Sequence, residues 1–187
     1  RYAGQQSAGG PPAAAPAVEL VPISQLPVQA LLDYDRGFFP SARAGFLQAW
    51  VTQPVLLDLV CARLGPDVWI RWDQAVAKGP GAPLFPFHQD NGYSQVDFEH
   101  LQVWIGLSAA DAENGGLWLV PGSHRRQWTH ENVDGVVHVL EPTDDAICIP
   151  AEVGDVVLFS SHTVHATLPN VTDRLRWAYV VEYVSLD

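Results

Sequence analysis

Residues 154–184 read "GDVVLFSSHTVHATLPNVTDRLRWAYVVEYV" and decide the fold class. Two runs rich in β-branched and aromatic residues, 155–165 and 174–184, flank a segment of turn-forming residues at 168–173. Apolar runs bounded by Pro, Asn, Asp and Thr are typical of β-strands joined by a turn. The stretch therefore predicts two strands connected as a hairpin.

Segments of the same kind recur on the N-terminal side of this stretch, separated by Gly, Pro, Asn and Asp. They are residues 67–77, 84–90, 101–109, 116–123, 136–141 and 146–151. About eight short strands at this spacing indicate a sandwich or barrel, here of the jelly-roll kind. A jelly roll is open at one end, and its inward-facing side chains can line a cavity. The expected fold is mainly β with flanking helices.

The N-terminal third of the chain has a different character. Residues 1–17 are rich in Ala, Gly and Pro, which predicts a mobile arm or loop. From residue 41 to residue 64 apolar residues recur at helical spacing, interrupted at Pro54 and ended by Gly65. We expect two helices on the outside of a sheet, within a single domain of residues 1–187. Because the chain starts at Arg1 and contains no Met, we also expect the natural N-terminal part to be missing.

Composition narrows the classes of partner. The formal net charge is −11, and partners that present a phosphate backbone require clustered Lys and Arg, so we expect no nucleic-acid partner. No apolar run is long enough to span a membrane, and no membrane partner is expected. Cys61 and Cys148 lie in apolar runs and are interpreted as core residues in a reducing, cytoplasmic setting. A small-molecule partner and a monomer or homodimer are expected.

One polar pair points to a metal site. His88 and Asp90 are two residues apart at the end of an apolar run, and alternate residues of a strand share a face. Alone, such a pair is most simply a buried structural contact. With one more histidine it would form the two-His-one-carboxylate set that suits non-haem Fe(II). His162 and His165 are the candidates. A hairpin centred between Asn170 and Val171 would place His165 opposite Arg176, which favours His165.

Three blocks of the sequence together resemble the phytanoyl-CoA dioxygenase family. They are "DQAVAKGPGAPLFPFHQDNGY" at 73–93, "LQVWIGLSAADAENGGLWLVPGSHR" at 101–125 and the closing block at 154–183. The resemblance runs over residues 41–183. It implies a double-stranded β-helix (a cupin-like jelly roll) and a dioxygenase that uses Fe(II), 2-oxoglutarate and O2. The implied reaction hydroxylates an unactivated C–H bond of a small molecule and releases succinate and CO2.

The resemblance also assigns residues. His88, Asp90 and His165 would bind iron. Arg176 would hold the far carboxylate of 2-oxoglutarate, helped by Thr167. The remaining cofactor-binding residues that it implies line the same cavity: Gln74, Lys78 and Gln102. The chain departs from the family at "HATLPN", where many members have "HGSGPN". Two alternatives remain, a cupin-like metal enzyme that does not use 2-oxoglutarate and a catalytically inactive jelly-roll binding module.

Overall fold

The computed structural model describes residues 18–22, 50–94 and 98–186, and the predicted arm at 1–17 lies outside them. The elements are β1 (Val18–Pro22), α3 (Pro54–Leu64), β2 (Val68–Lys78), β3 (Phe85–His88), α4 (Asn91–Ser94), β4 (His100–Gly106), β5 (Leu117–Leu119), the 3-10 turn η1 (Ser123–Arg125), β6 (His130–Val133), β7 (Val136–Val139), β8 (Ile147–Ile149), β9 (Asp155–Ser160), β10 (His165–Thr167) and β11 (Arg176–Ser185). None of the helices within these ranges is long and apolar enough to cross a membrane.

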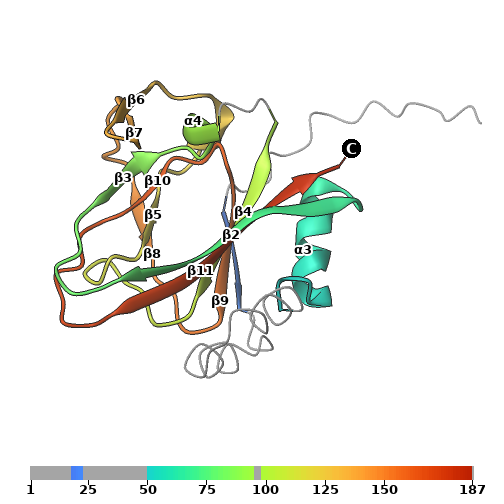
Figure 1. Cartoon of the computed structure of the whole chain (residues 1–187), viewed down its shortest axis with the longest axis horizontal. Coiled ribbons are helices and arrows are strands. Elements are labelled where there is room, and N and C mark those ends of the chain that lie inside the picture. The colour runs from blue at the N-terminus through green and yellow to red at the C-terminus, as the bar shows by residue number, and fades with distance from the viewer. Residues whose placement is uncertain (1–17, 23–49, 95–97, 187) are drawn as a thin grey trace, which may run out of the picture.

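Two antiparallel sheets face each other (Figure 1). The larger has the strand order β1-β9-β4-β11-β2, and the smaller has the order β3-β10-β5-β8. A two-stranded ribbon, β6-β7, stands beside them. This is the expected jelly roll, and the fold class predicted from the sequence is confirmed.

Alternation along β11 separates the two faces of the larger sheet. Tyr179, Val181 and Tyr183 face outward and pack with Leu56 and Val60 of α3. The Tyr183 hydroxyl donates to the Val51 carbonyl at 2.7 Å, which ties the segment before α3 to the sheet. Helix α3 thus covers the outer face, as expected (Figure 1). The described part of the predicted helical region is helical at 50–51 and again from Pro54, while residues 41–49 lie outside the described residues.

The inner face of the larger sheet forms a second core with the smaller sheet. Trp104, Val157, Phe159 and Ala178 pack there against Leu117, Leu119 and Ile149 of the opposite sheet. Each strand therefore buries alternate residues in two different layers, as the pleat of a β-strand requires. The inner layer also leaves room for a cavity.

The predicted hairpin is wrong. Strand β9 ends at Ser160, a turn intervenes, and β10 starts at His165 in the other sheet. Strand β10 pairs with β3 and β5, whereas β11 pairs with β2 and β4. His165 is consequently opposite His88 and Leu119, and Arg176 is opposite Lys78. The chain crosses between the sheets because β9 and β10 each find long-range partners that local sequence does not encode. Strands β1 and β6 were not predicted.

Candidate metal centre and cavity

The three candidate metal ligands lie at one end of the neighbouring strands β3 and β10 of the smaller sheet. His88 is the last residue of β3 and His165 the first of β10, and the two are cross-strand partners. Asp90 follows β3, where its backbone N–H donates to the Ser161 carbonyl at 3.0 Å. One ligand atom from each residue lies within 4.8 Å of the others. The structure therefore brings together the three residues that the sequence singled out.

Hydrogen bonds to backbone carbonyls fix the orientation of both imidazole rings. His88 Nδ1 lies 2.8 Å from the Pro86 carbonyl oxygen, and His165 Nδ1 lies 3.0 Å from the Thr163 carbonyl oxygen. A carbonyl can only accept, so each Nδ1 carries the proton and each Nε2 offers a lone pair. The Nε2 atoms lie 3.5 Å and 3.8 Å from Asp90 Oδ1. This is the arrangement by which carbonyl groups orient histidine ligands of metals.

Burial and charge keep His165 and Asp90 in the protonation states that a metal requires. Burial, followed by repulsion from His88, lowers the pKa of His165 to about 4. Burial acts to raise the pKa of Asp90, but the nearby histidines, His165 first, hold it below its usual value. A neutral imidazole and an ionised carboxylate are the metal-binding forms at neutral pH. The set of two imidazoles and one carboxylate fits Fe(II).

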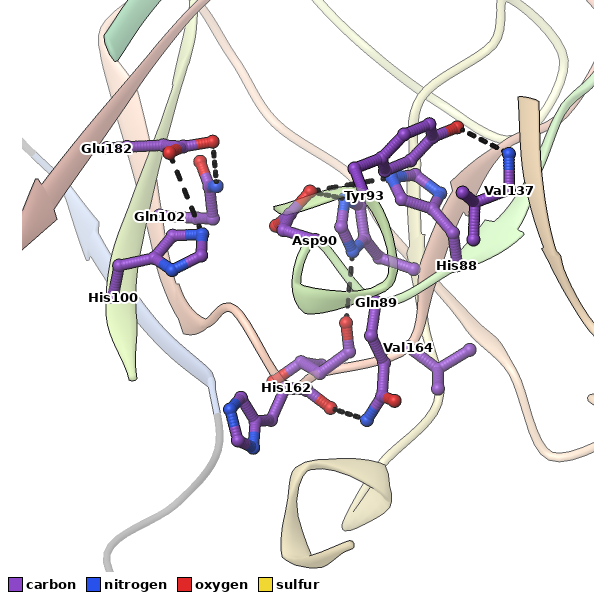
Figure 2. Close-up of polar contacts among 12 residues, drawn as sticks. His88, Gln89, Asp90, Tyr93, His100, Gln102, Val137, His162, Val164 and Glu182 are labelled. Atoms are coloured by element: carbon purple, nitrogen blue, oxygen red, sulfur yellow. Dashed lines mark hydrogen bonds and ion pairs between the residues drawn. The ribbon is translucent and has the colours of Figure 1, made fainter. Parts of the chain in front are cut away.

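Gln89 holds the segment between the two local ligands. Its fully buried amide donates to the Arg126 carbonyl at 2.9 Å and also to the His162 carbonyl, and its oxygen accepts from the Trp128 backbone N–H at 2.9 Å. Figure 2 shows the contact with His162 beside Asp90. His162 therefore contributes its backbone to the site, and its ring does not line the cavity.

A second polar group of the cavity is cationic. Arg176 is 1% exposed and donates to the carbonyls of Gly115 (3.0 Å) and Val76 (3.5 Å). Lys78 is 5% exposed and donates to the carbonyl and the hydroxyl oxygen of Thr167, at 2.8 and 2.9 Å. Within residues 18–22, 50–94 and 98–186, no carboxylate pairs with either cation.

Burial without a counter-ion lowers the pKa of both cations. Burial, and then the charge of Arg176, lowers the pKa of Lys78 to about 8. Burial also lowers the pKa of Arg176, to about 10. Two desolvated cations that lack an acidic partner form a site for an anion, because an incoming carboxylate would supply the missing partner.

One cavity of about 780 Å³ contains both groups. Every site residue predicted from the sequence lines it: Gln74, Lys78, His88, Asp90, Gln102, His165, Thr167 and Arg176. Gln74 lies on the edge strand β2 and is exposed, whereas Gln102 is buried on β4. His165 and Thr167 line the same cavity as Arg176, but they lie on the opposite sheet. His165 and Arg176 therefore face each other across the cavity and are not paired in a hairpin.

Several residues that line the cavity were not predicted from the sequence to do so, above all Arg71, Trp72 and Glu182. Glu182 could have been predicted from the sequence. It lies six residues after Arg176 on the same strand, and residues an even number apart point to the same face. Arg174, two residues before Arg176, donates to Asp111 at 2.7 Å on the surface.

Comparison with known families gives one clear match. The family described as phytanoyl-CoA dioxygenase matches residues 33–178, well over half of the chain.

Individual relatives are more distant. The methylphosphonate hydroxylase of Gimesia maris is 28% identical over 137 residues, which cover 73% of this chain and 53% of that protein. The 2-aminoethylphosphonate dioxygenase of an uncultured bacterium is 24% identical over 161 residues, 83% of this chain and 57% of the relative. The chain thus spans about half the length of the curated relatives it matches. The crystal structure of EvdO2 from Micromonospora carbonacea with 2-oxoglutarate has a TM-score of 0.75 at 22% identity, covering 91% of this chain and 86% of EvdO2.

Proposed function

We propose that this chain, which belongs to the phytanoyl-CoA dioxygenase family, hydroxylates an unactivated C–H bond of a small molecule. Fe(II), 2-oxoglutarate and O2 are the cofactor set of this family. The prediction of that set from the sequence is confirmed by the family match and by the His88, Asp90 and His165 ligand set. The proposed reaction converts R–H, 2-oxoglutarate and O2 into R–OH, succinate and CO2, so one oxygen atom enters the product and the other enters succinate.

The observation that carries the proposal is that a single cavity holds a three-ligand metal set and an uncompensated pair of cations. 2-Oxoglutarate needs both, because its keto-acid end is a metal ligand and its far carboxylate needs a cationic partner. Strand β10 links the two groups, since it carries the ligand His165 and, two residues later, Thr167, which accepts from Lys78.

The metal set, the two cations and Thr167 then have separate roles. His88, Asp90 and His165 would hold iron, which supplies the oxidative chemistry when it is bound. Arg176 and Lys78 bind the far carboxylate, and the Thr167 hydroxyl, which accepts from Lys78, is left free to donate its own proton to that carboxylate. The apolar side chains of Leu117, Phe159 and Val180 exclude water around the co-substrate.

The test is oxygen-dependent succinate formation by the purified chain with Fe(II) and 2-oxoglutarate. We expect succinate, and ¹⁸O₂ should label it. Asp90→Ala should abolish the reaction, whereas Asp145→Ala, a matched exposed carboxylate on the surface, should leave it unchanged. A chain that binds metal and forms no succinate would instead be a cupin-like metal enzyme of another kind. A chain that binds neither would be an inactive binding module.

The substrate and cellular setting are also proposals. The named relatives act on phosphonates, and the family is named for an acyl-CoA substrate, so a small molecule is the class that we propose. We further propose a single oxygenase domain that acts as a monomer or homodimer in the cytoplasm. Free Cys61 and Cys148 suit a reducing compartment. Light scattering of the purified chain tests the oligomeric state.

A further inference from the structure

The inner face of β11 runs from the cationic end of the cavity to a second, different polar group. Arg176, Val180 and Glu182 line the cavity at alternate positions. Six residues of extended chain separate Arg176 from Glu182, about 20 Å at roughly 3.3 Å per residue. Glu182 therefore lies well away from the carboxylate-binding pair. Figure 2 shows it with Gln102 and His100, on the opposite side of Asp90 from His88.

A β-bulge builds this group. The register of β11 and β2 shifts between Glu182, opposite Trp72, and Tyr183, opposite Ile70. Arg71 is the extra residue. Successive residues of an unbroken strand point to opposite faces, but here both Arg71 and Trp72 line the cavity, while Ile70 packs in the outer core. Bulges re-aim side chains in this way beside functional sites. The bulge lets Arg71 form an ion pair with Glu182.

Gln102 completes the group and leaves an acceptor without a partner. Its amide nitrogen donates to Glu182 Oε1 at 2.9 Å. Because a carboxylate can only accept, this contact fixes the orientation of the amide, and the amide oxygen Oε1 cannot bond to Glu182. Gln102 is 2% exposed, and no donor among the described residues reaches its Oε1. A buried acceptor in a cavity wall is unfavourable until a donor meets it.

The group is close to neutral as a whole. Arg71 compensates the charge of Glu182, and His100 Nε2 lies 3.6 Å from Glu182 Oε2. Burial is the main influence on His100 and lowers its pKa despite the neighbouring carboxylate, so the ring is neutral at pH 7. Neither a cationic nor an anionic ligand would find an unmatched charge here. What the group lacks is a hydrogen-bond donor for the buried amide oxygen of Gln102.

We propose that Gln102, held by Glu182 and Arg71, is the substrate-recognition residue of this cavity and accepts a hydrogen bond from a hydroxyl group of a neutral substrate. Trp72, which is 43% exposed, is opposite Glu182 on the neighbouring strand β2 and offers an apolar wall for the substrate carbon skeleton. The inference rests on the proposed function, because it assigns the carboxylate-binding end to 2-oxoglutarate and this end to the substrate. It gives Gln102 a role in substrate binding in place of the cofactor-binding role that the family resemblance implied.

The test uses the chain loaded with Zn(II), which is redox-inert, and with 2-oxoglutarate. Calorimetry measures the binding of hexanol and of its methyl ether, which keeps the oxygen but cannot donate. We expect hexanol to bind about three- to tenfold more tightly, the range of one net hydrogen bond. Hexanoate, hexylphosphonate and hexylamine should bind more weakly than hexanol.

Two variants then test whether Gln102 causes the preference for hexanol over its methyl ether. Gln102→Met removes the acceptor at similar size and should abolish the preference for hexanol over the ether. Gln127→Met, a matched exposed glutamine outside the cavity, should retain it. Equal binding of hexanol and ether by the parent chain, or no binding of hexanol, would overturn the proposal without any variant. Tighter binding of a charged probe would also overturn it.

The outcomes separate this inference from the function on which it rests. Succinate formation with Fe(II), 2-oxoglutarate and O2 in the absence of probe supports the function whatever the probes show. Succinate formation combined with no preference for hexanol rejects the recognition residue alone. Absence of succinate and of 2-oxoglutarate binding rejects the function, and with it this assignment.

Discussion

Lys78 and Arg176 are direct cross-strand partners on β2 and β11, so two cations stand opposite each other inside the cavity. Like charges in this relationship are destabilising, and burial adds to the cost. Folding alone does not favour such a pair. A dicarboxylate between the two side chains would turn the repulsion into two attractions, and three predictions concern this pair.

Arg176→Ala should weaken 2-oxoglutarate binding by about ten- to a hundredfold, because it removes charge-assisted hydrogen bonds of about 1.5–3 kcal/mol. Fe(II) binding should hardly change, since Arg176 is no ligand of the metal set. Anaerobic calorimetry measures both affinities. Arg174→Ala is the matched control, because Arg174 is on the surface and bonded to Asp111. Unchanged 2-oxoglutarate affinity in Arg176→Ala would show that another residue anchors the co-substrate.

The affinity for 2-oxoglutarate should fall as the pH rises through about 8, the pKa of Lys78. Below this pH the ammonium is charged and attracts the carboxylate, whereas above it the free protein must first bind a proton. The loss should approach, at most, about tenfold per pH unit. Arg176, with a pKa of about 10, stays charged over most of this range. Lys78→Met should bind more weakly at neutral pH and lack the slope, and a slope that persists in this variant would assign it to another group.

Lys78→Met should also stabilise the ligand-free fold, by about 1 kcal/mol at pH 7, because it removes a buried charge beside Arg176. The parent's own pH dependence provides a second check. Burial lowers the folded-state pKa from 10.5 to about 8, so between these values the unfolded chain binds a proton that the folded chain does not. The parent's free energy of unfolding should therefore gain a contribution over this window, which Lys78→Met lacks. Urea titrations at pH 7 and 10 measure both effects.

His88→Ala and His165→Ala should each weaken Fe(II) binding by at least about a hundredfold, since two ligands cannot hold the metal in this geometry. His162→Ala should keep the metal, because only its backbone takes part through the bond from Gln89. Co(II) absorption titrations provide the comparison, with His138→Ala on β7 as a second control. Loss of metal in His162→Ala but not in His165→Ala would reverse the assignment of the third ligand.

The composition of short runs was sufficient to predict most of the strands, although not β1 and β6, but it did not predict the sheet to which each strand belongs. The run 155–165 has one strand-like composition, yet it contains β9, a turn and the first residue of β10. The turn is held by the Ser161 N–H on the His100 carbonyl at 2.8 Å, a contact with a residue 61 positions away. No local pattern encodes such a bond. The predicted hairpin failed for this reason.

The sequence predicted a set of residues that line one cavity, because the three motif blocks are specific, but it did not predict how they are arranged. His165 and Arg176 share the cavity, but they reach it from different sheets, so the predicted hairpin register was wrong. Glu182 could have been found by counting alternate residues from Arg176. Arg71 could not, since a bulge that shifts the parity of β2 leaves no mark in its sequence.

Strand β10 has a consequence for the choice of co-substrate. One three-residue strand carries the ligand His165 at its start and Thr167, the partner of Lys78, at its end. The separation of these residues, about 7 Å along the backbone, is set by the extended conformation of the strand. The backbone of β10 therefore favours co-substrates of a particular length. We expect an oxo-dicarboxylate one carbon shorter than 2-oxoglutarate to bind more weakly, because it has less length with which to contact the metal set and the cationic pair together.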